Sequence, residues 1–121
     1  MISFILPTRN TVLYTQRAYQ SLRKYNPTAE IILLDDLSTD GTLEYLDTLI
    51  DDNLVIYKNN PVNFPKTYDY QKFSGHTILY NFGVEMAKNK IVSLFQGVTD
   101  LMPLGKYPDT IILAVRIYIF S

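Results

Sequence analysis

The chain of 121 residues contains no cysteine. It can therefore form no disulfide, no thiolate nucleophile and no cysteine metal site, so its fold does not depend on an oxidising compartment, and the cytoplasm is the expected location. An excess of one charge is also lacking, because 11 basic and 12 acidic residues give a net charge of -1 without any run of like charges. This balance disfavours binding to nucleic acid or to an anionic membrane surface.

Long hydrophobic runs are absent as well. The apolar residues 2–6 have no basic leader and are too few for a signal peptide, so they predict a first strand. The apolar run 110–120 contains Arg116 and is shorter than the roughly 20 residues of a membrane span, which predicts a buried strand. We therefore expect no transmembrane segment.

What the chain does have is the composition of a globular protein, with 47% hydrophobic and 19% charged residues. Its length suits one domain, 1–121, with one hydrophobic core. Apolar runs predict strands at 2–6, 30–34, 54–57, 91–95 and 111–120, with Pro7 closing the first. Residues 59–75 are polar and contain two prolines, which is typical of an exposed loop.

Helices are expected between the strands. The first is predicted by a stripe at Tyr14, Ala18, Leu22 and Tyr25, the second by Leu43, Leu46 and either Leu49 or Ile50, and the third spans about 76–88. Alternating strands and helices predict a three-layer α/β/α, Rossmann-like, mostly parallel sheet. Ligands of such sheets bind beyond the carboxyl ends of the strands.

Two polar segments follow predicted strands. In the segment 7–10, Pro7, Thr8 and Asn10 can offer hydrogen-bonding groups to a ligand, although such residues also make ordinary turns. In the segment 35–42, alternation along a strand lets one of Asp35 and Asp36 point into a cleft, and Asp36 is our first choice. The other reading is that this segment only ends a strand and caps a helix, with Asp40 as the capping residue.

A third segment, 75–87, begins the third helix. Helix N-termini favour anions, so His76 and Thr77 could meet a phosphate, while a surface position remains the alternative for His76. Asn81 and Gly83 form helices poorly, which indicates a packing or binding reason for their presence.

These three segments, in this order, resemble glycosyltransferase family 2, whose fold is of the GT-A kind. The matching pieces are Pro7 to Asn10, Asp35 to Thr42, and Gly75, Asn81, Gly83 and Ala87, within residues 2–95. The resemblance implies a nucleotide-diphosphate sugar as ligand, usually a uridine one, with Pro7, Thr8 and Asp36 around base and ribose. Asn10, Asp35 and the segment holding Gly75, His76 and Asn81 would complete the donor site.

Members of this family usually carry an Asp-x-Asp acid pair that holds a divalent cation against the diphosphate. Here Gln96 and Gly97 follow the strand, and Asp100 is the nearest acid. The resemblance therefore implies Mg²⁺ or Mn²⁺ as cofactor, with Asp100 as the metal ligand, while a turn residue before Leu101 is the alternative for Asp100. A departing nucleoside diphosphate develops negative charge that such a cation neutralises.

Relatives place the acceptor site and the catalytic base further along the chain, so we expect this sequence to lack the C-terminal acceptor part. The first functional hypothesis is sugar transfer to an acceptor with inversion, and the second is an inactive nucleotide-binding or interaction module. A nucleotidyltransferase is disfavoured, because no Gly-rich phosphate loop with a lysine or arginine follows the first strand. The apolar C-terminal strand is expected to mediate self-association.

Overall fold

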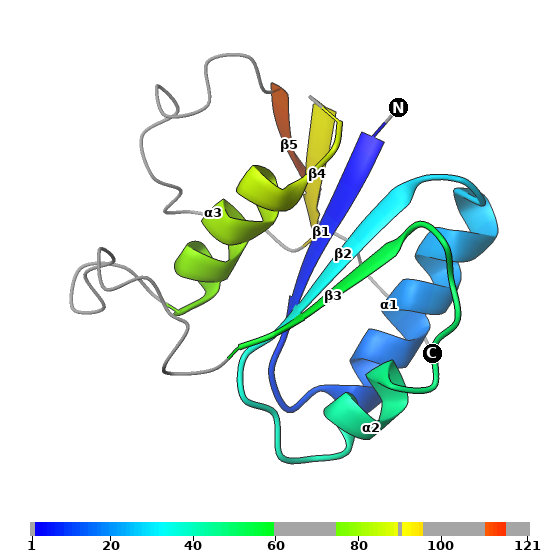
Figure 1. Ribbon diagram of the computed structural model, residues 1–121, viewed down its shortest axis with the longest axis vertical. Coiled ribbons are helices and arrows are strands. Elements are labelled where there is room, and N and C mark those ends of the chain that lie inside the picture. Colours follow the sequence, from blue (N-terminus) through cyan, green and yellow to red (C-terminus); the bar gives the residue numbers. More distant parts are fainter. Residues whose placement is uncertain (1, 60–74, 90, 96–110, 116–121) are drawn as a thin grey trace.

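The computed structural model describes residues 2–59, 75–89, 91–95 and 111–115 (Figure 1). Its elements, in chain order, are β1(Ile2–Thr8), α1(Val12–Tyr25), β2(Glu30–Asp35), α2(Thr42–Leu46), β3(Leu54–Lys58), α3(Gly75–Met86), β4(Ile91–Phe95) and β5(Ile111–Val115).

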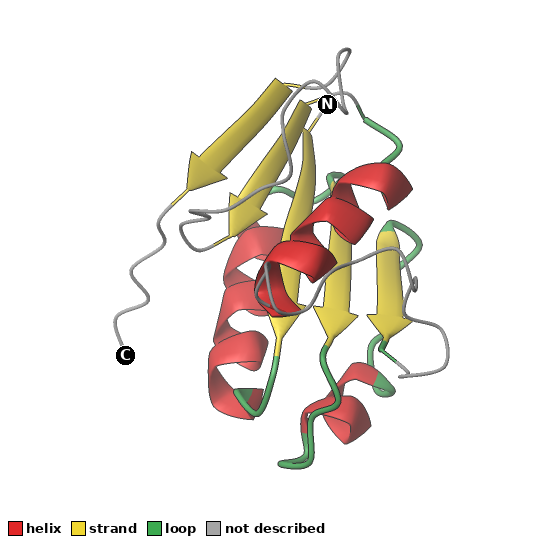
Figure 2. Ribbon diagram, turned by 90° about the vertical axis from the view of Figure 1, so that its left-hand side faces the viewer, coloured by secondary structure: helices red, strands yellow, loops and turns green. Residues whose placement is uncertain are grey.

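The strands form one sheet in the order β3-β2-β1-β4-β5, and all of the described pairings are parallel. The helices α1 and α2 lie on one face of this sheet and α3 on the other, so that Figure 2, seen from the α3 side, has α3 in front of the strands and α1 behind them. The predicted three-layer, Rossmann-like fold is confirmed. The strand order reverses between β1 and β4, the kind of position where sheets of this type bind ligands.

Alternation along the strands divides the core between the two faces. One cluster packs the sheet against α1 and α2; its buried members are Leu6, Ala18, Tyr19, Leu22, Ile31, Leu33 and Leu46. On the other face α3 approaches the sheet closely, because a Cβ placed on Gly83 would lie 2.4 Å from Cγ2 of Ile5. The rings of Phe82 and Tyr57 stack there, with centroids 5.3 Å apart. Close packing against Ile5 therefore explains why a glycine stands at position 83 within the helix.

One position of the predicted apolar stripes, Tyr25, is wrong, and of the two alternatives Leu49 and Ile50 the structure selects Leu49. The buried face of α1 is formed by Thr15, Ala18, Tyr19 and Leu22. At 3.6 residues per turn Tyr25 falls on the flank of that face, and it is 73% exposed. In the second stripe α2 ends at Leu46, so Ile50 lies beyond the helix and is 99% exposed, while Leu49 packs against the core.

The sequence predicts that Pro7 closes the first strand, but β1 continues to Thr8, which pairs with Asp35. Proline lacks an N–H group, so it is tolerated where a strand has no neighbour to receive that bond. The carbonyl of Thr8 faces β2, since it accepts a hydrogen bond from the N–H of Asp36. The backbone nitrogen of Pro7, which carries no hydrogen, therefore faces the β4 side of β1. The described pairing of β1 with β4 ends before it, at Ile5.

Other boundaries differ by one or two residues, as helix ends commonly do. The third helix spans Gly75–Met86 instead of 76–88, and the third strand extends to Lys58. Of the predicted strand 111–120, residues 111–115 form β5 and the rest lies outside the described residues. Within the part of the chain that is described, none of the helices is long and apolar enough to cross a membrane.

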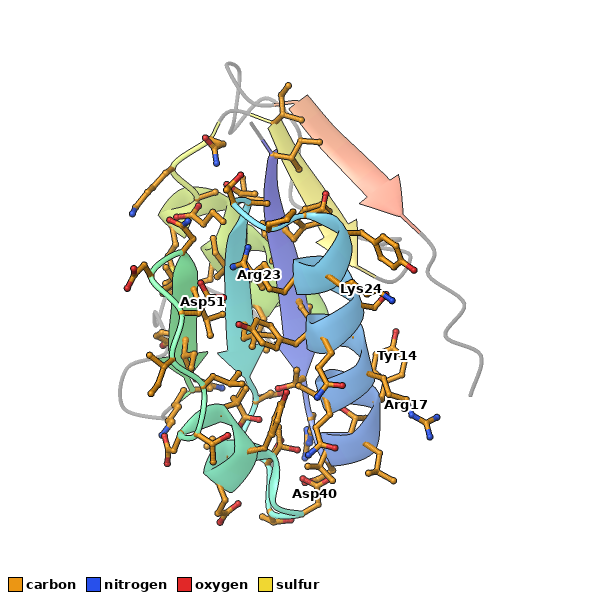
Figure 3. All side chains as sticks on the ribbon, turned by 90° about the vertical axis from the view of Figure 1, so that its right-hand side faces the viewer. Tyr14, Arg17, Arg23, Lys24, Asp40 and Asp51 are labelled. Atoms are coloured by element: carbon orange, nitrogen blue, oxygen red, sulfur yellow. The ribbon has the colours of Figure 1, made fainter. Side chains whose placement is uncertain are left out.

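A polar cluster at the amino edge of the sheet joins α1 to the segment before β3. Arg23 reaches from α1 to Asp51, as the labelled side chains in Figure 3 show, and its Nη2 lies 2.8 Å from Oδ2 of Asp51. Tyr19 donates a hydrogen bond to the same oxygen. The guanidinium also donates to the carbonyls of Asn26 and Ala29, at 2.9 and 2.7 Å. These contacts fix the connection from α1 into β2.

Candidate functional site

The carboxyl ends of β1, β2 and β3 bring three polar segments together. Thr8 pairs with Asp35, and Asp35 pairs with Lys58, so the three strands end side by side. Backbone bonds extend this alignment one residue further: Asp36 N–H donates to the Thr8 carbonyl at 2.8 Å, and Asn59 N–H donates to the Asp35 carbonyl at 2.7 Å. The residues after these strands therefore have fixed positions at one edge.

Asp35 is a structural residue at this edge. It is 1% exposed, and both of its carboxylate oxygens accept hydrogen bonds within the chain. Oδ1 accepts from the Thr8 hydroxyl at 3.1 Å, and Oδ2 accepts from the Ser38 N–H at 2.9 Å. The hydroxyl of Thr8, itself 2% exposed, is used in the same contact. The polar groups of these two side chains thus hold β1, β2 and the loop after β2 together.

Asn10 ties the loops after β1 and β2. Its N–H donates to the Ser38 hydroxyl at 2.9 Å, and its side-chain oxygen accepts from the Thr39 N–H at 2.7 Å. Its φ of 50° is in the left-handed region, which asparagine tolerates better than most residues. Pro7 is buried within β1. The expected ligand contacts of Pro7, Thr8 and Asn10 therefore fall on residues that already have structural roles.

Asp40 connects the N-termini of two helices. Its Oδ1 accepts from the N–H and the hydroxyl of Thr42, and its Oδ2 accepts from the N–H of Val12 at 3.1 Å. The hydrogen bond from the Thr42 hydroxyl lowers the pKa of this carboxyl. The predicted capping of α2 is thus seen, although Gly41 is the N-cap residue itself. Asp40 also serves α1, beside whose first turn it lies in Figure 3.

Asp36 differs from Asp35, because within the described residues only one of its carboxylate oxygens accepts a hydrogen bond. Its side chain is 13% exposed and lies next to Arg9, whose Nη1 is 3.7 Å from Oδ2 and whose side chain is 62% exposed. Its Oδ1 accepts from Nδ2 of Asn59 at 2.9 Å. By alternation along β2, Asp36 lies on the α3 side of the sheet and Asp35 on the α1 side. The choice of Asp36 over Asp35 as a ligand contact stays a prediction.

Arg9 and Asn59 were not selected by sequence reasoning. Arg9 stands inside the segment 7–10, where attention went to its neighbours with neutral polar groups. Asn59 directly follows a predicted strand, and the rule that ligands bind beyond carboxyl strand ends could have identified it. Its polar side chain instead assigns it to the exposed loop predicted over residues 59–75.

The remaining predicted site residues are described in part or not at all. Gly75, His76 and Asn81 belong to α3, whose first turn lies at the same edge as the ends of β1 to β3 (Figure 1), but their side-chain positions are outside the description. Asp100 lies outside the described residues altogether.

The described carboxylates do not by themselves form a metal centre. Among residues 2–59, 75–89, 91–95 and 111–115 there is no group of three or more acidic or histidine side chains able to hold a metal ion. At the carboxyl edge Asp35 is fully hydrogen-bonded and Asp36 faces a guanidinium. A metal-binding role for Asp100 therefore stays a prediction.

Comparison with known proteins gives one result. The family described as Glycosyl transferase family 2 matches residues 3–95, more than half of the chain. No curated protein and no solved structure matches the chain.

Proposed function

Because the chain belongs to glycosyl transferase family 2, we propose that it binds a nucleotide-diphosphate sugar at the carboxyl edge of its sheet. The base would lie against Asp36 and Arg9, beside the reversal of strand order between β1 and β4. A uridine nucleotide is the favoured donor. A cytoplasmic location is still expected from the cysteine-free composition.

The observation that carries this proposal is the contrast between the two adjacent acids. Asp35 has both oxygens occupied inside the protein, whereas Asp36 keeps Oδ2 toward an exposed arginine. A carboxylate that is mostly buried but partly open can accept a strong hydrogen bond from a base N–H or a ribose hydroxyl, because water competes weakly there. Arg9 supplies a donor for a carbonyl or a phosphate oxygen next to it.

Sugar transfer is the activity that family membership favours. In this proposal the described residues bind and orient the nucleotide-sugar donor, and none of them is assigned as the catalytic base. A divalent cation, if held by Asp100 and the donor, would neutralise the charge that develops on the departing diphosphate. A non-catalytic nucleotide-binding module is the second candidate, and the lack of an acid directly after Phe95, where the family places its first aspartate, favours it.

Calorimetric titration with UDP and UDP-sugars, with and without Mn²⁺, tests the proposal. Asp36→Asn removes the charge from the open carboxylate, and we expect it to weaken binding by roughly tenfold or more, as for one hydrogen bond to a charged group. Asp52→Asn is the matched control, since Asp52 is an exposed acid at the opposite edge of the sheet. Equal affinity of the two variants would refute the assignment of Asp36.

Transfer and binding are separated by a second measurement on the same samples. Release of UDP from a UDP-sugar, dependent on Mn²⁺ and lost in Asp100→Ala, supports an enzyme with a cation at Asp100. Tight binding of the UDP-sugar without any release supports the binding module.

A further inference from the structure

Asn59 is held firmly beside Asp36. It directly follows β3, is 8% exposed, and donates its backbone N–H to the Asp35 carbonyl at 2.7 Å. Its side-chain Nδ2 donates to Oδ1 of Asp36 at 2.9 Å. The backbone hydrogen bond fixes the position of the Asn59 main chain, and the side-chain hydrogen bond fixes the orientation of the Asp36 carboxylate.

The amide of Asn59 can take only one orientation. With Nδ2 toward Asp36, its own Oδ1 is buried and has no hydrogen-bond partner among the described residues. Turning the amide over would place its oxygen against a carboxylate oxygen, which is repulsive, so the contact with Asp36 decides the orientation. A buried acceptor without a partner is destabilising, and native proteins contain few of them. Asn59 thus orients Asp36 although its own oxygen stays unpaired.

The consequence for Asp36 is that its two oxygens are not equivalent. Oδ1 is engaged by a buried amide, while Oδ2 lies toward the guanidinium of Arg9, whose side chain is 62% exposed. One lone pair of Oδ1 is thus already used, while Oδ2 accepts no hydrogen bond from the described residues and has a cationic donor next to it. A free carboxylate would instead offer two equivalent acceptors side by side.

Nucleobases differ in how many adjacent donors they present. The imide edge of uracil or thymine has a single N–H between two carbonyl oxygens. Guanine presents two neighbouring N–H donors, which match both oxygens of a free carboxylate. The single N–H of an imide is therefore fully paired by Oδ2, whereas the second N–H of guanine meets an oxygen that has already accepted one hydrogen bond.

We propose that Asn59 is a positioning residue that sets base selectivity, by engaging Oδ1 of Asp36 so that the site takes an imide base and discriminates against guanine. This inference rests on the proposed function, because it concerns the same nucleotide site. Arg9 then donates to a carbonyl of the imide, while Oδ2 accepts from its N–H.

The test is the ratio of the dissociation constants for GDP and UDP, measured by calorimetry, with TDP as a further ligand. In Asn59→Ala the lone pair of Oδ1 that Asn59 uses becomes available, and we expect the GDP/UDP ratio to fall by about tenfold, the effect of one hydrogen bond to a charged group. Asn53→Ala is the matched control, since Asn53 lies just before β3, at the other edge of the sheet, and donates from Nδ2 to the Thr28 carbonyl at 3.4 Å. It should leave the ratio unchanged. Between the two imide bases, the tighter of UDP and TDP identifies the one that the site takes.

The outcomes separate this inference from the function on which it rests. If the GDP/UDP ratio of dissociation constants falls in Asn59→Ala but not in Asn53→Ala, the result supports Asn59 as the residue that sets base selectivity. If Asn59→Ala lowers the melting temperature and weakens UDP and GDP by the same factor, the residue is merely structural and the inference is wrong, while nucleotide binding stands. If the unmodified chain binds none of the three nucleotides, both the inference and the proposed function are overturned.

Discussion

Leu37 combines two features that are uncommon in one residue. Its φ is 57°, in the left-handed region, and its apolar side chain is 46% exposed. For an L-residue with a Cβ this conformation costs roughly 1–2 kcal/mol, while glycine adopts it freely but loses more entropy on folding. We expect Leu37→Gly to raise the free energy of unfolding by up to about 1 kcal/mol, as measured by urea denaturation.

At Gly41, in the same loop, the reverse kind of substitution replaces a glycine by a residue with a Cβ. Its φ is 101°, and a Cβ at this position would have no atom within 4 Å, so Gly41→Ala acts on the backbone conformation without a steric clash. It should destabilise the protein while Leu37→Gly stabilises it. Destabilisation by Leu37→Gly would mean that the leucine side chain has a packing role that outweighs the strain.

At the scale of elements, the cluster of Tyr19, Arg23 and Asp51 joins α1 to the start of β3. Burial raises the pKa of Asp51, but the hydrogen bonds from Tyr19, the Asn53 N–H and Arg23, with the charge of Arg23, outweigh burial, and the pKa is lowered. A carboxyl whose pKa is lower in the folded state contributes stability above its unfolded pKa, near 4, and loses it as the pH falls through the folded value.

Asp51→Asn should therefore cost about 2 kcal/mol of unfolding free energy at pH 7, because it weakens a largely buried ion pair. The difference from the unmodified chain should shrink steadily below about pH 4. Urea denaturation at several pH values from 7 to 2.5 measures this, with Asp52→Asn as the control for loss of an exposed acid. A difference that stays constant across that range would show that the charge of Asp51 is not what the cluster requires.

The element contacts also explain why part of the site was predictable. The segments after β1 and β2 were identified because parallel strands end at the same edge of a sheet. The different roles of the two acids in the second segment were not predictable, because Asp35 and Asp36 are neighbours with identical side chains. Only the contacts of Thr8 and Ser38 with Asp35 distinguish the structural acid from the open one.

For the whole molecule, β5 occupies the end of the described strand order. An apolar strand at a sheet edge offers unpaired backbone groups to a second copy. We predict concentration-dependent dimers in sedimentation equilibrium, which Leu113→Lys on β5 should weaken, because charge on an edge strand opposes pairing. Lys58→Glu on the opposite edge strand, β3, is the comparison variant. A monomer at all concentrations, or equal weakening by both variants, would exclude self-association through β5.

The sequence by itself determined the alternation of strands and helices, the parallel sheet, the edge at which polar segments meet, and the family. These depend on apolar periodicity and on chain-order rules, which act over short stretches and survive small errors in element boundaries. Tertiary structure decided which face of α1 is buried, why Gly83 stands in a helix, and which acid has both oxygens hydrogen-bonded within the chain. Those depend on contacts between residues far apart in the chain, such as Asp36 with Asn59 or Gly83 with Ile5, whose partners are brought together only when the strands and helices have packed.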